Sequence, residues 1–63
     1  MSETGETELS RIRRWRLRAD ECRVVASETT STMTRRNLLD VAEDYEAMAS
    51  DAEVRLKKAA TDR

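Results

Sequence analysis

The 63-residue sequence contains no proline, no phenylalanine and no histidine, and it has one glycine and one cysteine. Turns between strands usually require Gly, Pro or Asn-Gly, so this composition favours long helices over sheets. Without histidine, the chain lacks the side chain that most often acts as a general base. The one cysteine, Cys22, has no partner for a disulfide within the chain. These absences predict an all-α fold with no internal disulfide and with few means of catalysis.

The chain also lacks a long hydrophobic run and an excess of either charge. No stretch approaches the roughly 18 apolar residues that a membrane span requires. The N-terminus is acidic and polar, unlike the basic and then apolar start of a secretory signal. Charged residues make up 40% of the chain, yet the net charge is −1, so no overall field attracts nucleic acid or an anionic membrane. We therefore expect a cytoplasmic protein with no membrane partner.

Residues 38–56 carry the clearest pattern in the chain, because their apolar residues recur in alternating steps of four and three. This spacing forms one continuous stripe along an α-helix, whereas a strand would alternate at every second residue. Most of the remaining positions are carboxylates, so the helix is amphipathic and needs an apolar and preferably basic partner. We expect it to span about residues 33–58. The stripe consists of Leu38, Ala42, Tyr45, Ala49, Ala52 and Leu56.

Residues 8–28 supply such a partner, because they carry a stripe with the same helical spacing and several arginines in their first half. Thr4 or Thr7 is the expected N-cap, and glutamates in the first turn suit the helix dipole. We therefore expect a first helix over residues 8–28. Its stripe consists of Ile12, Trp15, Ala19, Cys22 and Ala26.

The run Thr29-Thr30-Ser31-Thr32 separates the two helical patterns. Consecutive β-branched and hydroxyl residues are weak helix formers, and their oxygens compete for nearby backbone hydrogen bonds. Either Ser31 or Thr32 is the expected N-cap of the second helix. Because the break contains neither Gly nor Pro, a single bent helix is the alternative to two helices.

An antiparallel hairpin satisfies the apolar and the charge patterns together. A turn near residue 30 places Trp15 opposite Tyr45, and it places the arginines of residues 11–18 opposite the carboxylates of residues 43–51. The predicted fold class is therefore all-α, an antiparallel two-helix hairpin over residues 8–60, with a flexible acidic arm over 1–7 and a frayed tail over 61–63. The expected hairpin core consists of Ile12, Trp15, Ala19, Cys22, Leu38, Ala42, Tyr45, Ala49 and Leu56.

A single copy of this hairpin is expected to be marginally stable, because the chain is short and its stripes are rich in alanine. Self-association is the usual remedy, and two hairpins side by side would make a four-helix bundle. We expect a homodimer or a homotetramer. Four further apolar residues, two on the flank of the second stripe and two on another side of the first helix, are candidates for the surface between copies or for the binding of another protein. They are Leu17, Val24, Val41 and Met48.

The segment Arg11-Ile-Arg-Arg-Trp-Arg-Leu-Arg18 is the sharpest local signal for a ligand. Arginine binds phosphates with two hydrogen bonds and tryptophan can stack on a base, so arginine-rich helices are used to bind RNA. The interpretation we favour is that Trp15 belongs to the core and that the arginines neutralise the second helix. The candidate nucleic-acid contacts are Arg11, Arg13, Arg14, Arg16 and Arg18.

Two features of the sequence could carry chemistry, and each has a simpler explanation. The carboxylates of Asp40, Glu43 and Asp44 have the spacing to hold a hard cation, but they also match the arginines as a solvated face. Cys22 has arginines nearby that would make an exposed thiol redox-active, but its place on the stripe predicts a small buried hydrophobe. No glycine-rich phosphate loop is present. We expect no enzyme, no metal site and no cofactor.

The pattern Arg18-Ala-Asp-Glu-Cys-Arg23, followed by Leu38-Leu-Asp-Val-Ala-Glu-Asp-Tyr-Glu46, resembles a group of short bacterial proteins common in alphaproteobacteria. Members carry an Ala-x-Glu-Cys-Arg helix and then a Leu-Leu-x-x-Ala-x-x-Tyr/Trp-Glu helix, and the resemblance covers residues 15–53. This chain departs from the group at the turn, where Asp or Asp-Pro is common. The resemblance implies a small helical hairpin and brings no established activity.

Two functions follow as hypotheses. The first is a small, non-enzymatic, self-associating helical protein that acts by binding another protein, as an adaptor, regulator or assembly factor. The second is a small nucleic-acid-binding protein that uses the arginines of residues 11–18. The second hypothesis predicts binding that weakens steeply as salt is added.

Overall fold

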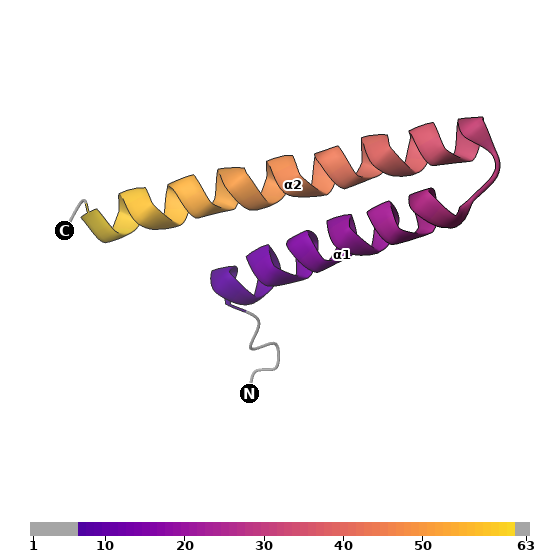
Figure 1. Ribbon diagram of the computed structural model, residues 1–63. Helices are drawn as coiled ribbons and strands as arrows, with labels where there is room; N and C mark the ends of the chain where they lie inside the picture. The colour runs from indigo at the N-terminus through magenta and orange to yellow at the C-terminus, as the bar shows by residue number, and fades with distance from the viewer. Residues whose placement is uncertain (1–6, 62–63) are drawn as a thin grey trace.

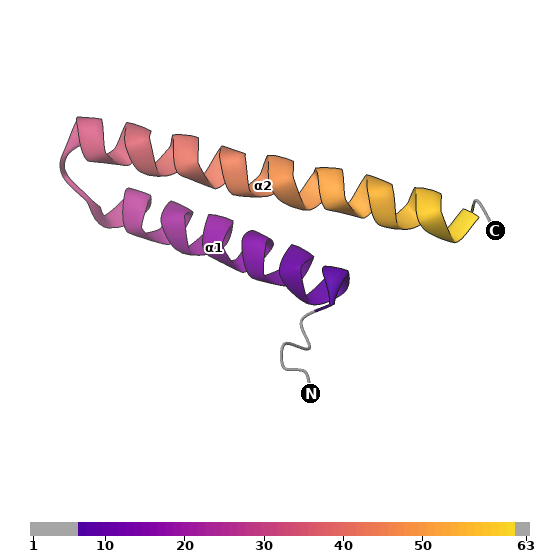
Figure 2. The same ribbon diagram turned by 180° about the vertical axis from the view of Figure 1, so that it is seen from behind.

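The computed structural model describes residues 7–61, which form two helices packed side by side in opposite directions (Figure 1). Helix α1 spans Glu8–Glu28 and helix α2 spans Thr32–Thr61, and no strand forms within the described residues. Both views of the ribbon show a hairpin whose second helix runs past the start of the first (Figure 2). The predicted all-α antiparallel hairpin is confirmed. Most of the proposed arm and tail lies outside the described residues.

Side-chain hydroxyls cap the start of both helices. The backbone N–H of Ser10 donates to Oγ1 of Thr7 over 3.1 Å, and the backbone N–H of Thr34 donates to Oγ of Ser31 over 3.2 Å. Each bond satisfies a backbone donor that has no partner within its own helix. Of the alternative caps suggested by the sequence, Thr7 and Ser31 are the ones used.

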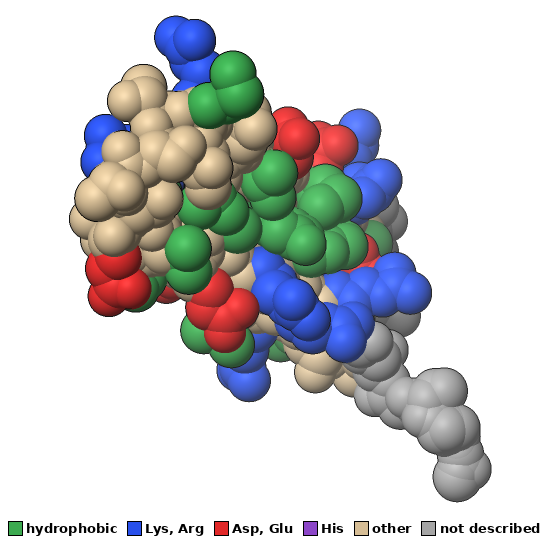
Figure 3. Space-filling view, turned by 90° about the vertical axis from the view of Figure 1, so that its right-hand side faces the viewer, with side chains coloured by type: hydrophobic (Ala, Val, Ile, Leu, Met, Phe, Trp, Pro, Cys, Tyr) green, Lys and Arg blue, Asp and Glu red, His purple; other side chains and the backbone are tan. Residues whose placement is uncertain are grey.

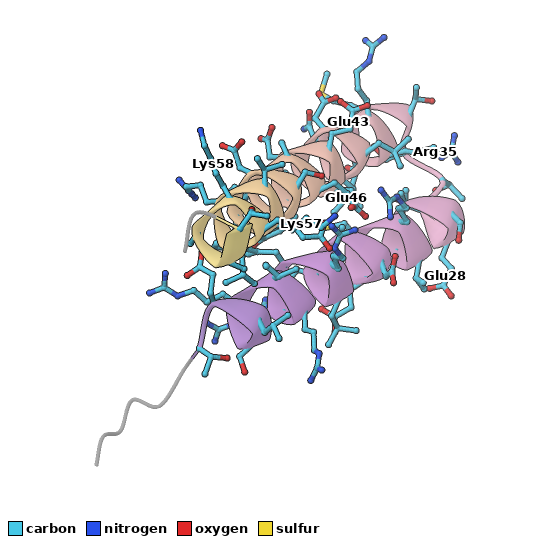
Figure 4. The ribbon with its side chains drawn as sticks, turned by 90° about the vertical axis from the view of Figure 1, so that its left-hand side faces the viewer. Glu28, Arg35, Glu43, Glu46, Lys57 and Lys58 are labelled. Atoms are coloured by element: carbon cyan, nitrogen blue, oxygen red, sulfur yellow. The ribbon has the colours of Figure 1, made fainter. Side chains whose placement is uncertain are left out.

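A side chain from α2 caps the C-terminal end of α1. The last turn of α1 contains no basic residue and no glycine follows it, so its terminal carbonyls lack the usual local partners. Arg35 supplies them, because its Nε donates to the carbonyl of Ala26 over 3.2 Å and its Nη2 donates to the carbonyl of Thr29 over 2.8 Å. Figure 4 shows Arg35 at the turn end of the hairpin. This guanidinium places positive charge at the negative end of the α1 dipole and links the two helices across the turn.

We expect Arg35→Ala to lower the free energy of unfolding by about 1–2 kcal/mol, because two charge-assisted hydrogen bonds to helix-terminal carbonyls are lost. Arg36→Ala is the matched control, since Arg36 is exposed and forms no hydrogen bond or ion pair with any other residue of the described segment 7–61. Chemical denaturation followed by circular dichroism, at one protein concentration, measures both variants. An equal loss in the two would contradict a specific capping role for Arg35.

The core between the helices is built almost entirely from alanine. One large side chain, Ile12, joins five alanines as the buried residues of the hairpin, and Ile12, Ala49 and Ala52 form one cluster. Small side chains along a helix contact let the two axes approach closely. The helices therefore meet along a narrow seam that buries little apolar surface. The buried residues are Ile12, Ala19, Ala26, Ala42, Ala49 and Ala52.

The larger residues that we expected in the core lie at the edges of this seam. Trp15, Cys22, Leu38 and Tyr45 are half-buried. Leu56, which we also placed in the core, is 36% exposed. It lies one turn beyond Ala52. The C-terminal part of α2 runs past the start of α1 (Figure 1).

Candidate interaction surface

The seam between the helices has two chemically different sides. Successive residues of an α-helix are about 100° apart around its axis, so the residues three and four after a buried position lie on opposite sides of it. On α1, Trp15 and Arg16 stand three and four residues after Ile12. On α2, Tyr45 and Glu46 stand three and four residues after Ala42. Because the helices are antiparallel, the two aromatic residues share one side of the seam and the two charged residues share the other.

The charged side is held by a network of ion pairs that crosses between the helices. Arg16 contacts Glu53 at 2.8 Å and Glu46 at 3.7 Å, and Arg23 contacts Glu46 at 3.1 Å. Arg23 is also 3.2 Å from Asp20 on its own helix. Figure 4 shows Glu46 between the two helices. Its carboxylate forms ion pairs with both Arg16 and Arg23.

These pairs fix the register of the hairpin more than they stabilise it. Their side chains are all at least one-third exposed or close to it, and such pairs typically contribute about 0–1 kcal/mol each. The sequence pattern anticipated Arg16 and Glu46. It missed Arg23 and Glu53. The one signal for them was that Arg23 follows Arg16, and Glu53 follows Glu46, by seven residues, a spacing that places two residues on the same side of a helix.

The other side of the seam carries the two aromatic residues, with arginines along its border. Trp15 packs against the buried cluster of Ile12, Ala49 and Ala52. It also lines an open hollow together with Tyr45, Arg14 and Arg18. The expected neighbours Trp15 and Tyr45 are thus brought to one place, and neither is fully covered.

Apolar side chains of α2 extend this surface outward from Tyr45. Val41 precedes Tyr45 by four residues and Met48 follows it by three, so the three side chains lie in adjacent rows of one helix face. Val41 and Met48 are each 41% exposed. Figure 3 shows hydrophobic side chains next to one another on the face turned to the viewer, with charged side chains of both signs beside them. We call this surface the aromatic face and define it as Trp15, Cys22, Val41, Tyr45 and Met48.

The structure separates the four residues proposed for the surface between copies. Val41 and Met48 belong to the aromatic face. Leu17 and Val24 follow Arg16 and Arg23 by one residue, so they lie about 100° further round α1, beyond the charged side of the seam. They are 57% and 55% exposed. A single flat partner therefore cannot cover both pairs.

The five arginines of residues 11–18 do not form one cationic surface either. Arg16 is held by Glu46 and Glu53, and Arg11 lies 3.9 Å from Glu8 of its own helix. Arg14 and Arg18 border the aromatic face. Arg13 is exposed on α1 three residues before Arg16. The arginines therefore point in several directions around α1, which is unlike a groove that follows a phosphate backbone.

The structure gives no support for a ligand site at the carboxylates of α2 or at Cys22. Among residues 7–61, no three side chains of the His, Cys, Asp or Glu types come together in a way that could hold a metal ion. Cys22 is a free, half-buried thiol. Within the same residues, neither helix combines the length and the apolar character needed to cross a membrane.

No protein-family model, no curated protein and no solved structure matches the chain. The resemblance of residues 15–53 to short bacterial hairpin proteins stays a prediction.

Proposed function

We propose that this chain is a small, non-enzymatic, self-associating helical protein that acts through protein–protein interaction, as an adaptor, regulator or assembly factor. The observation that carries the proposal is the mismatch between what the hairpin buries and what it exposes. One large apolar side chain is buried, whereas ten large apolar side chains are exposed within the described residues. Cys22 is a free thiol, which suits the reducing cytoplasm that we propose as its location.

This mismatch favours association over a solitary hairpin. Below about 70–80 residues, a single core seldom supplies enough stability, and oligomerisation is one of the standard solutions. An alanine seam contributes less than the leucine-rich contacts of most helical bundles, since each alanine buries little area. Exposed apolar residues scattered singly are ordinary, but Val41, Tyr45 and Met48 are contiguous and join Trp15 across the seam.

The test of this proposal is the absolute mass of the protein in solution. We expect light scattering across a dilution series to give a dimer or a tetramer at micromolar concentration. The apparent melting temperature should rise with protein concentration, because association stabilises the folded state by mass action. A fully helical monomer at every concentration would overturn self-association.

Nucleic-acid binding is the second candidate function, and one feature favours it. Arg14 and Arg18 stand beside Trp15 and Tyr45 around one hollow, so guanidinium groups and aromatic rings meet at the surface. Binding of a fluorescent single-stranded RNA at low and high salt tests this candidate. A Kd that weakens steeply with salt and is lost in the double variant Arg14→Gln, Arg18→Gln would favour it over protein association.

A further inference from the structure

We propose that the aromatic face binds a second copy of this chain, with α1 of each copy lying antiparallel against α2 of the other. The inference rests on the proposed self-association and specifies its geometry. The two copies would be related by a two-fold axis parallel to the helices, and together they would form a four-helix bundle. Three features of the hairpin lead to this arrangement.

The first feature is the difference between the two sides of the seam. Covering the charged side would remove water from Arg16, Arg23, Glu46 and Glu53, and burying such charges costs more than their mutual attraction returns. Covering the aromatic face would instead bury Trp15, Tyr45 and their apolar neighbours. The aromatic face is therefore the favourable surface for association.

The second feature is that the two borders of the aromatic face carry opposite charges. On α1 the border is formed by Arg18, which is three residues after Trp15, and by Arg14. On α2 the row outside Met48 contains Asp44 four residues before it and Asp51 three residues after it. If α1 lay against α1 of the second copy, arginines would meet arginines. If α1 lies against α2, the arginine border of each copy meets the aspartate border of the other.

The third feature is the register between α1 of one copy and α2 of the other, that is, which residues lie opposite each other. A two-fold axis parallel to the helices gives the contact between copies the same antiparallel offset as the contact within one copy. Within one copy, Arg16 contacts Glu46. Arg18 lies two residues after Arg16, and Asp44 lies two residues before Glu46, so the same offset brings Arg18 opposite Asp44 of the second copy. Apolar, charge and register requirements therefore agree on one arrangement.

The location of the contact is tested by a pair of matched substitutions. We expect Met48→Lys to convert the protein to a monomer at concentrations where the unchanged chain is a dimer, because an ammonium group would enter an apolar contact and face the arginine border of the second copy. Leu17→Lys is the control, since Leu17 is exposed on the far side of α1. It should leave the mass unchanged. A dimer that survives Met48→Lys and is lost in Leu17→Lys would overturn the aromatic face as the contact, while self-association itself would stand.

The pairing of helices is tested by charge reversal at the border, which leaves the core of the hairpin untouched. Arg18 and Asp44 are both exposed and form no ion pair with any residue in the described range 7–61. We expect Arg18→Glu and Asp44→Arg each to weaken the dimer about tenfold at low salt, because two symmetry-related attractions become repulsions. The double variant Arg18→Glu, Asp44→Arg should restore the dimer to within about threefold, since the attraction is recovered. Arg13→Glu is the control of equal charge change and should have no such effect.

The outcomes separate the two proposals. If Arg18→Glu and Asp44→Arg both leave the dimerisation Kd unchanged, the pairing of α1 with α2 of the second copy is wrong. A double variant as weak as either single variant would also overturn it. A folded monomer for the unchanged chain would overturn the proposed self-association itself, whatever the variants do.

Discussion

Ile12→Ala should leave the hairpin largely unfolded at room temperature. Among residues 7–61, Ile12 is the one large side chain that is buried, 4% exposed, and it packs on Ala49 and Ala52. Truncating a buried isoleucine to alanine costs about 2–5 kcal/mol, through lost transfer free energy and the cavity that remains. A chain of this size has a total stability of only about 3–9 kcal/mol at 0.05–0.15 kcal/mol per residue. The single substitution therefore removes a large fraction of what holds the fold together.

Circular dichroism with urea denaturation, at one fixed protein concentration, measures this loss. Leu9→Ala is the control, because Leu9 lies one turn before Arg13 on the same helix and is half exposed. We expect it to change the free energy of unfolding by less than about 1 kcal/mol. If Ile12→Ala and Leu9→Ala proved equally mild, the alanine seam with Ile12 would not be the stabilising contact of the hairpin.

Ala49→Leu should destabilise the hairpin by about 3 kcal/mol, although leucine is the more hydrophobic residue and a good helix former. Ala49 is fully buried in the cluster with Ile12 and Ala52. The added carbon atoms have no space in a contact made of small side chains, so the helices must separate or the side chain must take a strained rotamer. Separation would also lengthen the Arg16–Glu46 and Arg16–Glu53 contacts across the seam.

Ala47→Leu is the matched control for this prediction, because Ala47 is exposed two residues away on the same helix. It adds the same carbon atoms where there is space, and its effect on the unfolding midpoint should be close to zero. A stabilised Ala49→Leu protein would show that the seam has room for larger side chains, which would contradict the close approach of the two helices.

The fold could be predicted from the sequence because its signals are local and repeat along the chain. The steps of three and four from Leu38 to Ala52 define one face of a helix without reference to any other segment. Thr7 and Ser31 carry hydroxyls at the positions where helix starts need acceptors. The cap at the end of α1 could not be foreseen in this way. Arg35 reaches Ala26 and Thr29 only because the turn folds α2 back over them.

The candidate site was harder to predict because it depends on which side of the seam a residue occupies. From the sequence we grouped Leu17, Val24, Val41 and Met48 as one surface, although Val41 and Met48 flank the second stripe and Leu17 and Val24 lie on another side of the first helix. Packing the two helices divides them, with Val41 and Met48 beside Tyr45 and with Leu17 and Val24 beyond Arg16 and Arg23. The pattern along the sequence gives the position of a residue around the axis of its own helix. It does not say which residues of a second helix lie next to it.

By itself, the sequence determined the helical secondary structure and the position of the break near residue 30, and it favoured an antiparallel hairpin over a single bent helix. Periodicity, capping residues and complementary charge blocks all follow from the order of residues along the chain. The tertiary structure alone decided how little the hairpin buries. It placed alanines at the seam, left Trp15 and Tyr45 half-covered at its edge, and joined Arg16, Arg23, Glu46 and Glu53 on the opposite side. Close packing places small residues in the seam and larger residues on one side of it or the other. This arrangement exists only once two helices are in contact.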